Sequence, residues 1–105
     1  MKLSSLITDF LEYLEVDKGA SQKTIQNYDH YLKRFLDFSG DIDSKEIDLP
    51  VVRKYRLYLS RFTDPKTNKP LKRVTQNYFM IALRAFLRFL AKQDIESLTA
   101  EKIEL

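Results

Sequence analysis

The sequence predicts an all-α fold, a four-helix orthogonal bundle in which two helical hairpins pack across one another. Apolar residues recur every three or four positions in four separate segments, which is typical of amphipathic helices. The chain has only two Gly and three Pro, and these lie between the segments or at their edges. With 105 residues, 44% of them apolar and 31% charged, residues 1–105 are expected to form one soluble domain around a single core.

The first hairpin is predicted from residues 5–17 and 21–38. Ser4 and Ser5 are candidates to cap the N-terminus of the first helix. A short Gly-Ala link then turns the chain back. The hydroxyl of Ser21 is placed to accept a hydrogen bond from an N–H group in the first turn of the second helix.

The second hairpin is predicted from residues 50–62 and 72–92. Asp48 precedes a Leu-Pro pair, and proline is tolerated in the first turn of a helix, so the third helix is expected to start here. Apolar residues extend well round the fourth helix, which predicts a central position for it. Its main apolar face is expected to consist of Val74, Tyr78, Ile81, Ala82, Ala85, Phe86 and Phe89. Four tyrosines are expected to pack in the core with their hydroxyls at its rim: Tyr28, Tyr55, Tyr58 and Tyr78.

Two polar stretches connect these helices. Residues 41–49 are acidic and are expected to form a loop in which Asp41 and Asp43 only increase solubility. Residues 63–70 contain two Pro, an Asn and two Lys, which disfavour both a helix interior and a strand. This stretch is predicted to be an exposed basic loop.

The chain is poor in residues that could support catalysis or bind a metal. It has no Cys, which excludes disulfides, Cys-ligated zinc and thiol catalysis. His30 is the only histidine, so no second His or Cys can share a metal with it. We expect His30 to lie solvated on a helix face, with a DNA contact as the alternative. Because no Gly-rich phosphate loop occurs either, we expect no catalytic residue, no bound metal and no cofactor.

The N-terminal residues do not have the uninterrupted apolar core of a signal peptide. The apolar runs are also far shorter than a membrane span requires. A cytoplasmic protein without a membrane partner is therefore expected.

The charges are unevenly distributed along the chain, although the net charge is only +3. From Pro65 to Gln93 there is no Asp or Glu. Seven basic residues fall in this interval: Lys66, Lys69, Lys72, Arg73, Arg84, Arg88 and Lys92. The folded molecule is therefore expected to have a positive side and a negative side.

The second and fourth helices carry similar polar residues at their N-terminal ends. The second begins with Ser21, Lys23, Thr24, Gln26 and Asn27, and the fourth with Lys72, Arg73, Thr75, Gln76 and Asn77. Such side chains contact phosphates and base edges, and helix N-termini add N–H groups that favour phosphate. This pattern indicates binding to nucleic acid. The alternatives are an ordinary solvated surface and a protein-interaction module whose basic face meets an acidic partner.

Two ordered blocks of residues resemble a known family. The first block is Phe10, Tyr13 and Leu14, then Lys18-Gly19-x-Ser21-x-x-Thr24-Ile25-x-x-Tyr28, then Leu32 and Phe35. The second is Leu71, Thr75, Asn77, Ala82-Leu83-Arg84, Phe86 and Phe89-Leu90. Together they resemble the N-terminal core-binding, SAM-like domain of tyrosine recombinases, the phage-integrase and Xer-type enzymes.

The resemblance implies a four-helix domain that clamps one face of duplex DNA while a separate catalytic domain grips the other. The DNA-facing residues that it implies by position are Ser21, Lys23, Thr24, Asn27, Arg34, Lys72, Arg73, Thr75, Gln76, Asn77, Arg84 and Arg88. The stretch before the fourth helix is longer than is usual in the family, which predicts additional phosphate contacts from its lysines.

The resemblance also implies a role in DNA integration and recombination by a longer parent enzyme that assembles as a tetramer on paired DNA sites. The residues of the family's catalytic domain are missing from this chain. We therefore expect that the chain itself does not cut or join DNA. On its own it is expected to be a monomer.

Overall fold

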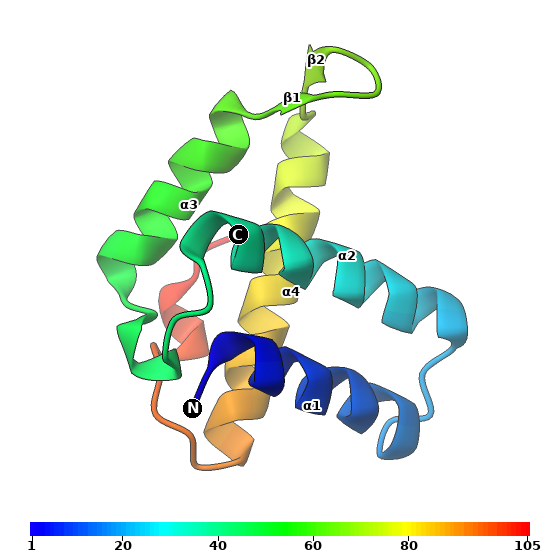
Figure 1. The fold of residues 1–105 in the computed structure, drawn as a ribbon, viewed down its shortest axis with the longest axis vertical. Coiled ribbons are helices and arrows are strands. Elements are labelled where there is room, and N and C mark those ends of the chain that lie inside the picture. Colours follow the sequence, from blue (N-terminus) through cyan, green and yellow to red (C-terminus); the bar gives the residue numbers. More distant parts are fainter.

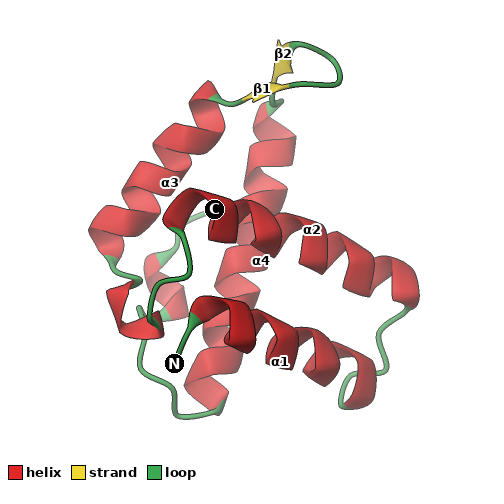
Figure 2. Ribbon diagram, in the orientation of Figure 1, coloured by secondary structure: helices red, strands yellow, loops and turns green.

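The computed structural model of residues 1–105 has the predicted all-α architecture (Figures 1 and 2). Its α-helices are α1 (Leu3–Val16), α2 (Gln22–Ser39), α3 (Leu49–Arg61) and α4 (Arg73–Lys92). Two short 3-10 helices, η1 (Ser44–Glu46) and η2 (Ala100–Lys102), and a hairpin of two short strands, β1 (Thr63–Asp64) and β2 (Lys69–Pro70), complete the fold. In Figure 1, α1 and α2 run side by side and both cross α4, which pairs with α3 in the second hairpin.

Helix α4 lies at the centre of the core and contacts the other three α-helices and η2. Its buried residues are Phe79, Met80, Ala82, Leu83, Phe86, Leu87, Phe89 and Leu90. Helix α1 packs on its C-terminal half, where the ring of Phe10 lies 5.7 Å from Phe86 and 5.3 Å from Phe89. Helix α2 packs nearer the N-terminus, where Tyr31 meets Phe79 at 5.0 Å. Aromatic contacts of this kind add to the free energy gained by burying the apolar surface.

The N-terminal caps of α2 and α3 were predictable because each depends on adjacent residues. The Ser21 hydroxyl accepts a hydrogen bond from the Thr24 N–H at 3.2 Å. The Asp48 carboxylate accepts one from the Val51 N–H at 2.9 Å, and the following proline lies in the first turn. Both contacts satisfy N–H groups that the helix itself leaves without a partner.

The predicted cap of α1 by Ser4 or Ser5 is wrong. The helix begins at Leu3, so both serines lie inside its first turn, and the preceding Lys2 gives no side-chain cap. Asp41 caps the helix instead: its carboxylate accepts hydrogen bonds from the N–H and the hydroxyl of Ser4, both at 2.8 Å. The prediction failed because the cap comes from a residue 37 positions away.

The predicted solubilising role of Asp41 and Asp43 is therefore also wrong. Asp43 accepts a hydrogen bond from the N-terminal ammonium of Met1 at 2.7 Å and caps η1 through the N–H of Lys45. The backbone of Leu3 donates to Ile42 in the same region. Residues 41–44 are thus bonded to the start of the chain.

Residues 63–70 are almost all exposed, as predicted, but they form a short hairpin although the sequence disfavoured a strand. Thr63 pairs with Pro70 and Asp64 with Lys69 in an antiparallel register. Within the turn, the Asp64 carboxylate accepts a hydrogen bond from the Lys66 N–H at 2.9 Å, and Asn68 has a φ of 56°. Asn tolerates this left-handed conformation, and Asp side chains commonly stabilise such turns, so local turn chemistry closes the hairpin.

Two predicted core residues of α4, Val74 and Tyr78, are exposed, with 53% and 48% of their surface accessible. Tyr78 lies on the same side of α4 as Phe89, since the two are eleven residues, or three turns, apart. Helix α1 covers Phe89 but reaches only the C-terminal half of α4. No helix therefore covers the first two turns on that side.

The position predicted for the Tyr55 hydroxyl is also wrong. Tyr55 is fully buried, with 0% of its surface accessible, between Phe35 at 4.9 Å and Phe38 at 5.3 Å. Its hydroxyl is buried and has no hydrogen-bond partner. Burial raises the pKa of this phenol because the charged form would lose its hydration, although the positive charge of Arg34 acts in the opposite direction.

Replacing Ser21 by Ala should lower the free energy of unfolding by about 1 kcal/mol, because an N–H of the first turn of α2 loses its partner. Chemical denaturation would measure this loss. Ser5→Ala is a suitable control, because Ser5 lies in the first turn of α1 and its hydroxyl makes no hydrogen bond. Equal stability of the Ser21 variant and the wild type would contradict the cap.

The Tyr55→Phe variant should be more stable than the wild type by about 1 kcal/mol. The substitution removes a buried hydroxyl without a partner and leaves the aromatic packing in place. Tyr58→Phe provides a control, since Tyr58 is only partly buried. A loss of stability in Tyr55→Phe would indicate that the hydroxyl has a hydrogen-bond partner.

Stability should fall as the pH drops below about 4, because the carboxyls of Asp41 and Asp43 have lowered pKa values in the folded protein. The backbone N–H of Ser4 is the main cause for Asp41, and the Met1 ammonium is the main cause for Asp43. The folded state therefore binds fewer protons than the unfolded state. The resulting stability is present above the ordinary pKa and is lost as the pH falls through the lowered one.

Thermal unfolding of the wild type and of Asp41→Asn between pH 2 and pH 6 would test this dependence. The variant should be less stable at pH 6 and should lose less stability on acidification. Asp9→Asn, at an exposed position within α1, should show the same dependence of stability on pH as the wild type. Parallel curves for Asp41→Asn and the wild type would rule out the contribution of Asp41.

Candidate nucleic-acid interface

The polar residues of α4 fall into two separate rows, because residues three, four or seven apart share one side of a helix. The first row is Lys72 and Thr75, and it leads to Phe79 one turn further on. Gln76 lies between the two rows and lines the same groove as Arg73 and Asn77. The second row, here named the arginine row, is Arg73, Asn77, Arg84 and Arg88. The arginine row borders the groove between α3 and α4 at one end and the C-terminal segment at the other.

The first row of α4 meets a polar row of α2 that consists of Lys23, Asn27, His30 and Arg34. Phe79 joins the two rows: its ring lies 5.6 Å from the ring of His30, and the Arg34 guanidinium lies 5.6 Å from its centre. We name this surface the α2/α4 face and define it by Lys23, Asn27, His30, Arg34, Lys72 and Thr75. The β1-β2 hairpin, with Lys66 and Lys69, immediately precedes its α4 part (Figure 1).

Arg34 is half-buried, unlike the exposed Lys23 and Asn27 on the same row. Its guanidinium lies 4.0 Å from the centre of the Phe62 ring, which follows α3. Cations are attracted to the electron-rich face of an aromatic ring, so this contact links α2 to the start of the hairpin. The side chain is therefore part of the packing as well as of the polar surface.

Three other predicted contact residues, Ser21, Thr24 and Gln76, form hydrogen bonds within the domain through their side chains. The hydroxyl of Ser21 caps α2 and also donates to the Thr24 hydroxyl at 3.1 Å. The Gln76 amide donates to the Leu71 carbonyl at 3.0 Å and so stabilises the junction between β2 and α4. These residues lie at the expected helix ends, but part of their hydrogen-bonding capacity is already occupied.

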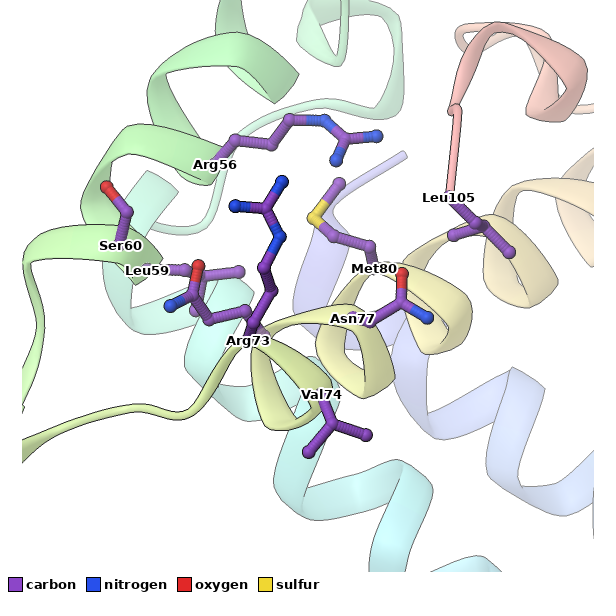
Figure 3. A pocket seen from close by; sticks show the side chains of 9 residues that line it. Arg56, Leu59, Ser60, Arg73, Val74, Asn77, Met80 and Leu105 are labelled. Atoms are coloured by element: carbon purple, nitrogen blue, oxygen red, sulfur yellow. The ribbon is translucent and has the colours of Figure 1, made fainter.

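The N-terminal half of the arginine row lines a groove between α3 and α4. Arg73 and Asn77 face Arg56 and Leu59 of α3 across a cavity of about 580 Å³ that Leu105 also borders (Figure 3). Arg56 donates to the backbone carbonyl of Glu104, so the C-terminal residues are attached to this groove. Figure 3 shows that the guanidinium groups of Arg56 and Arg73 both extend into the groove.

The other end of the arginine row faces acidic residues. Arg88 lines a cavity of about 350 Å³ together with Glu96 and Glu101 of the C-terminal segment. Carboxylates at this position weaken the attraction of the surface for a phosphate. The arginine row is therefore less uniformly positive than the α2/α4 face.

Sequence reasoning missed the basic residues of α3. Its polar positions include Arg53, Lys54, Arg56 and Arg61 and no acid. A signal was available, because Asp64 is the only acidic residue between Leu49 and Gln93. Arg53 and Arg56 line a second cavity, of about 810 Å³, next to the groove in Figure 3.

The sequence matches the profile of a family described as "Phage integrase, N-terminal SAM-like domain" over residues 7–94. This match includes most of α1 and all of α2, α3 and α4. The chain belongs to this family. This match confirms the family resemblance that the sequence showed between Phe10 and Phe35 and between Leu71 and Leu90.

Three relatives of this SAM-like domain are bacterial proteins named "Tyrosine recombinase XerC". The relative from Pediococcus pentosaceus is 34% identical over 92 residues, which cover 86% of this chain and 29% of the relative. The relative from Leptospira interrogans (serovar copenhageni) is 28% identical over 95 residues, covering 89% of this chain and 29% of the relative. The relative from Anoxybacillus flavithermus is 28% identical over 88 residues, covering 84% of this chain and 28% of the relative.

The SAM-like domain thus spans about three-tenths of the length of these relatives. The comparison with solved structures found no match. None of the helices combines the length and the apolar character that crossing a bilayer would require.

The positive charges of this SAM-like domain are almost entirely without ion-pair partners. Its two ion pairs are Met1 with Asp43 at 2.7 Å and Lys33 with Asp29 at 3.3 Å. Every Lys and Arg from Leu49 to Gln93 therefore lacks a carboxylate within ion-pairing distance. Apart from Arg88, which lies beside Glu96 and Glu101, these cations form surfaces that attract polyanions.

Proposed function

We propose that this domain binds duplex DNA through the α2/α4 face, as the N-terminal part of a tyrosine recombinase that acts in DNA integration and recombination. The observation that carries the proposal is the meeting of two polar helix rows at Phe79, beside a hairpin that adds Lys66 and Lys69. The cations of this surface lie next to amide and hydroxyl groups, the combination that contacts phosphates and base edges. The family membership and the tyrosine recombinase relatives support the same function.

In this proposal the domain clamps one side of the duplex and performs no chemistry itself. The lysines neutralise backbone phosphates, while Asn27 and Thr75 are the groups most able to reach base edges. Cutting and joining of DNA would belong to a separate catalytic domain of the parent enzyme, acting in the cytoplasm as a tetramer on paired sites. The isolated domain would bind DNA as a monomer.

A second candidate function is binding of an acidic protein segment in the groove between α3 and α4. Arg56 and Arg73 lie in this groove beside the apolar side chains of Leu59 and Met80. Basic residues next to apolar ones suit a partner segment that carries both carboxylates and apolar side chains. This function would use the arginine row and leave the α2/α4 face free.

The affinity of the domain for a labelled duplex of about 30 base pairs should fall steeply with salt. If three to five phosphates are neutralised, the logarithm of affinity should fall with the logarithm of salt concentration at a slope of roughly −3 to −4.5. In Lys23→Gln/Lys72→Gln, the slope should be less steep by roughly 1.8, because two phosphate contacts are lost. Fluorescence anisotropy at several salt concentrations would measure both slopes.

Arg84→Gln/Arg88→Gln is the matched control, since it removes the same charge from the arginine row and retains the side-chain stems. We expect its slope to stay close to that of the wild type. An equal decrease in the steepness of the salt slope in both double variants would contradict the assignment to the α2/α4 face. A wild type that does not bind the duplex at low salt would contradict DNA binding and favour the acidic protein partner.

A further inference from the structure

Arg34 is held between two aromatic rings that come from different parts of the chain. Its guanidinium carbon lies 4.0 Å from the centre of Phe62 and 5.6 Å from the centre of Phe79. Phe79 is buried in α4, and Phe62 is the half-buried residue between α3 and β1. Three segments therefore fix the position of a single cation.

The edge of the Arg34 guanidinium is unused in this arrangement. A guanidinium that stacks on an aromatic ring keeps its five N–H donors, which lie in its plane, for other partners. Arg34 makes no hydrogen bond to another side chain or to the backbone and no ion pair in this structure. A half-buried guanidinium with unoccupied donors is suited to donate hydrogen bonds to two oxygens of one phosphate.

The acidic groups near Arg34 leave these donors available. Asp37, one turn later on α2, is exposed and forms no ion pair with it. Asp64, two residues after Phe62, directs its carboxylate to the Lys66 N–H in its own turn. His30 lies one turn before Arg34 on α2, and its imidazole ring is also beside Phe79.

We propose that Arg34 forms a preorganised binding site for one phosphodiester group of the DNA backbone, with Phe62 and Phe79 as its positioning residues. This inference rests on the proposed DNA-binding function and extends it to two apolar residues. The rings hold the guanidinium in one orientation before DNA arrives, so less side-chain entropy is lost on binding. The site would lie where α2 meets the start of the hairpin, because Phe62 leads directly into β1.

The affinities of Phe62→Leu and Arg34→Lys for the same duplex would test this site. Phe62→Leu keeps every charge, so its salt slope should match the wild type while its Kd rises roughly three- to tenfold from lost preorganisation. Arg34→Lys should behave in the same way, because an ammonium group keeps the charge but not the planar fork. Arg34→Gln should in addition make the slope less steep by about 0.9, since one phosphate contact disappears.

Phe38→Leu is the matched control for loss of an aromatic ring. Phe38 is also half-buried and lies on α2, but it packs against Tyr55 and Tyr58, and its ring makes no cation–π contact with Arg34. Its Kd for the duplex should stay at the wild-type value. Thermal unfolding would verify that each variant is folded at the temperature of the binding measurement.

A measurement on the wild type keeps the test independent of the variants' stability. Addition of the duplex should shift the NMR resonance of the Arg34 Nε–Hε group and leave that of Arg53, on α3, in place. Wild-type affinity in both Phe62→Leu and Arg34→Lys, or an unmoved Arg34 resonance in a domain that binds DNA, would overturn this inference alone. Failure of the wild type to bind the duplex would overturn the proposed function and this inference together.

Discussion

Burial of α4 from several sides is the constraint on which the rest of the structure depends. Its apolar side chains extend over more of its circumference than one neighbouring helix can cover. The α1-α2 hairpin therefore covers one side, and α3 with the C-terminal segment covers another. The polar surface that remains on α4 is reduced to two rows, and the α2/α4 face exists because α2 crosses the helix at Phe79. The same packing that forms the core thus determines which cations become neighbours.

Most of the fold could be predicted from the sequence because its signals are local. Apolar periodicity defines all four helices, and the caps by Ser21 and Asp48 act on N–H groups only three residues away. The cap of α1 could not be predicted, since Asp41 is adjacent to Ser4 only after the hairpin has formed. Tyr78 was assigned to the core for a related reason: helical periodicity identifies a face but does not tell how far a neighbouring helix extends along it.

The candidate site was predictable in its residue types but not in its arrangement. Lys23, Arg34 and Lys72 were selected by their chemistry and by the family resemblance, and the fold brings their rows together at Phe79. Helical spacing already separates Arg84 and Arg88 from Lys72 and Thr75 on α4. Which groups border the arginine row depends on where α3 and the C-terminal segment pack, and periodicity does not reveal this. The aromatic contacts of Arg34 likewise join residues far apart in the sequence, so they become visible only in the folded chain.

The cap of α1 by Asp41 also has a consequence for the order in which the protein acquires structure during synthesis. Helix α1 is synthesised before α2, α3 and α4, but it has no side-chain cap from its own residues. Its first turn is completed only when residues 41–44 arrive, with Asp41 bonded to Ser4 and the Ser44 N–H bonded to the Met1 carbonyl. Until then α1 is a short helix without its tertiary partners, and such helices are marginal in water. The first turn of α1 therefore depends on a contact with residues that are made about forty positions later.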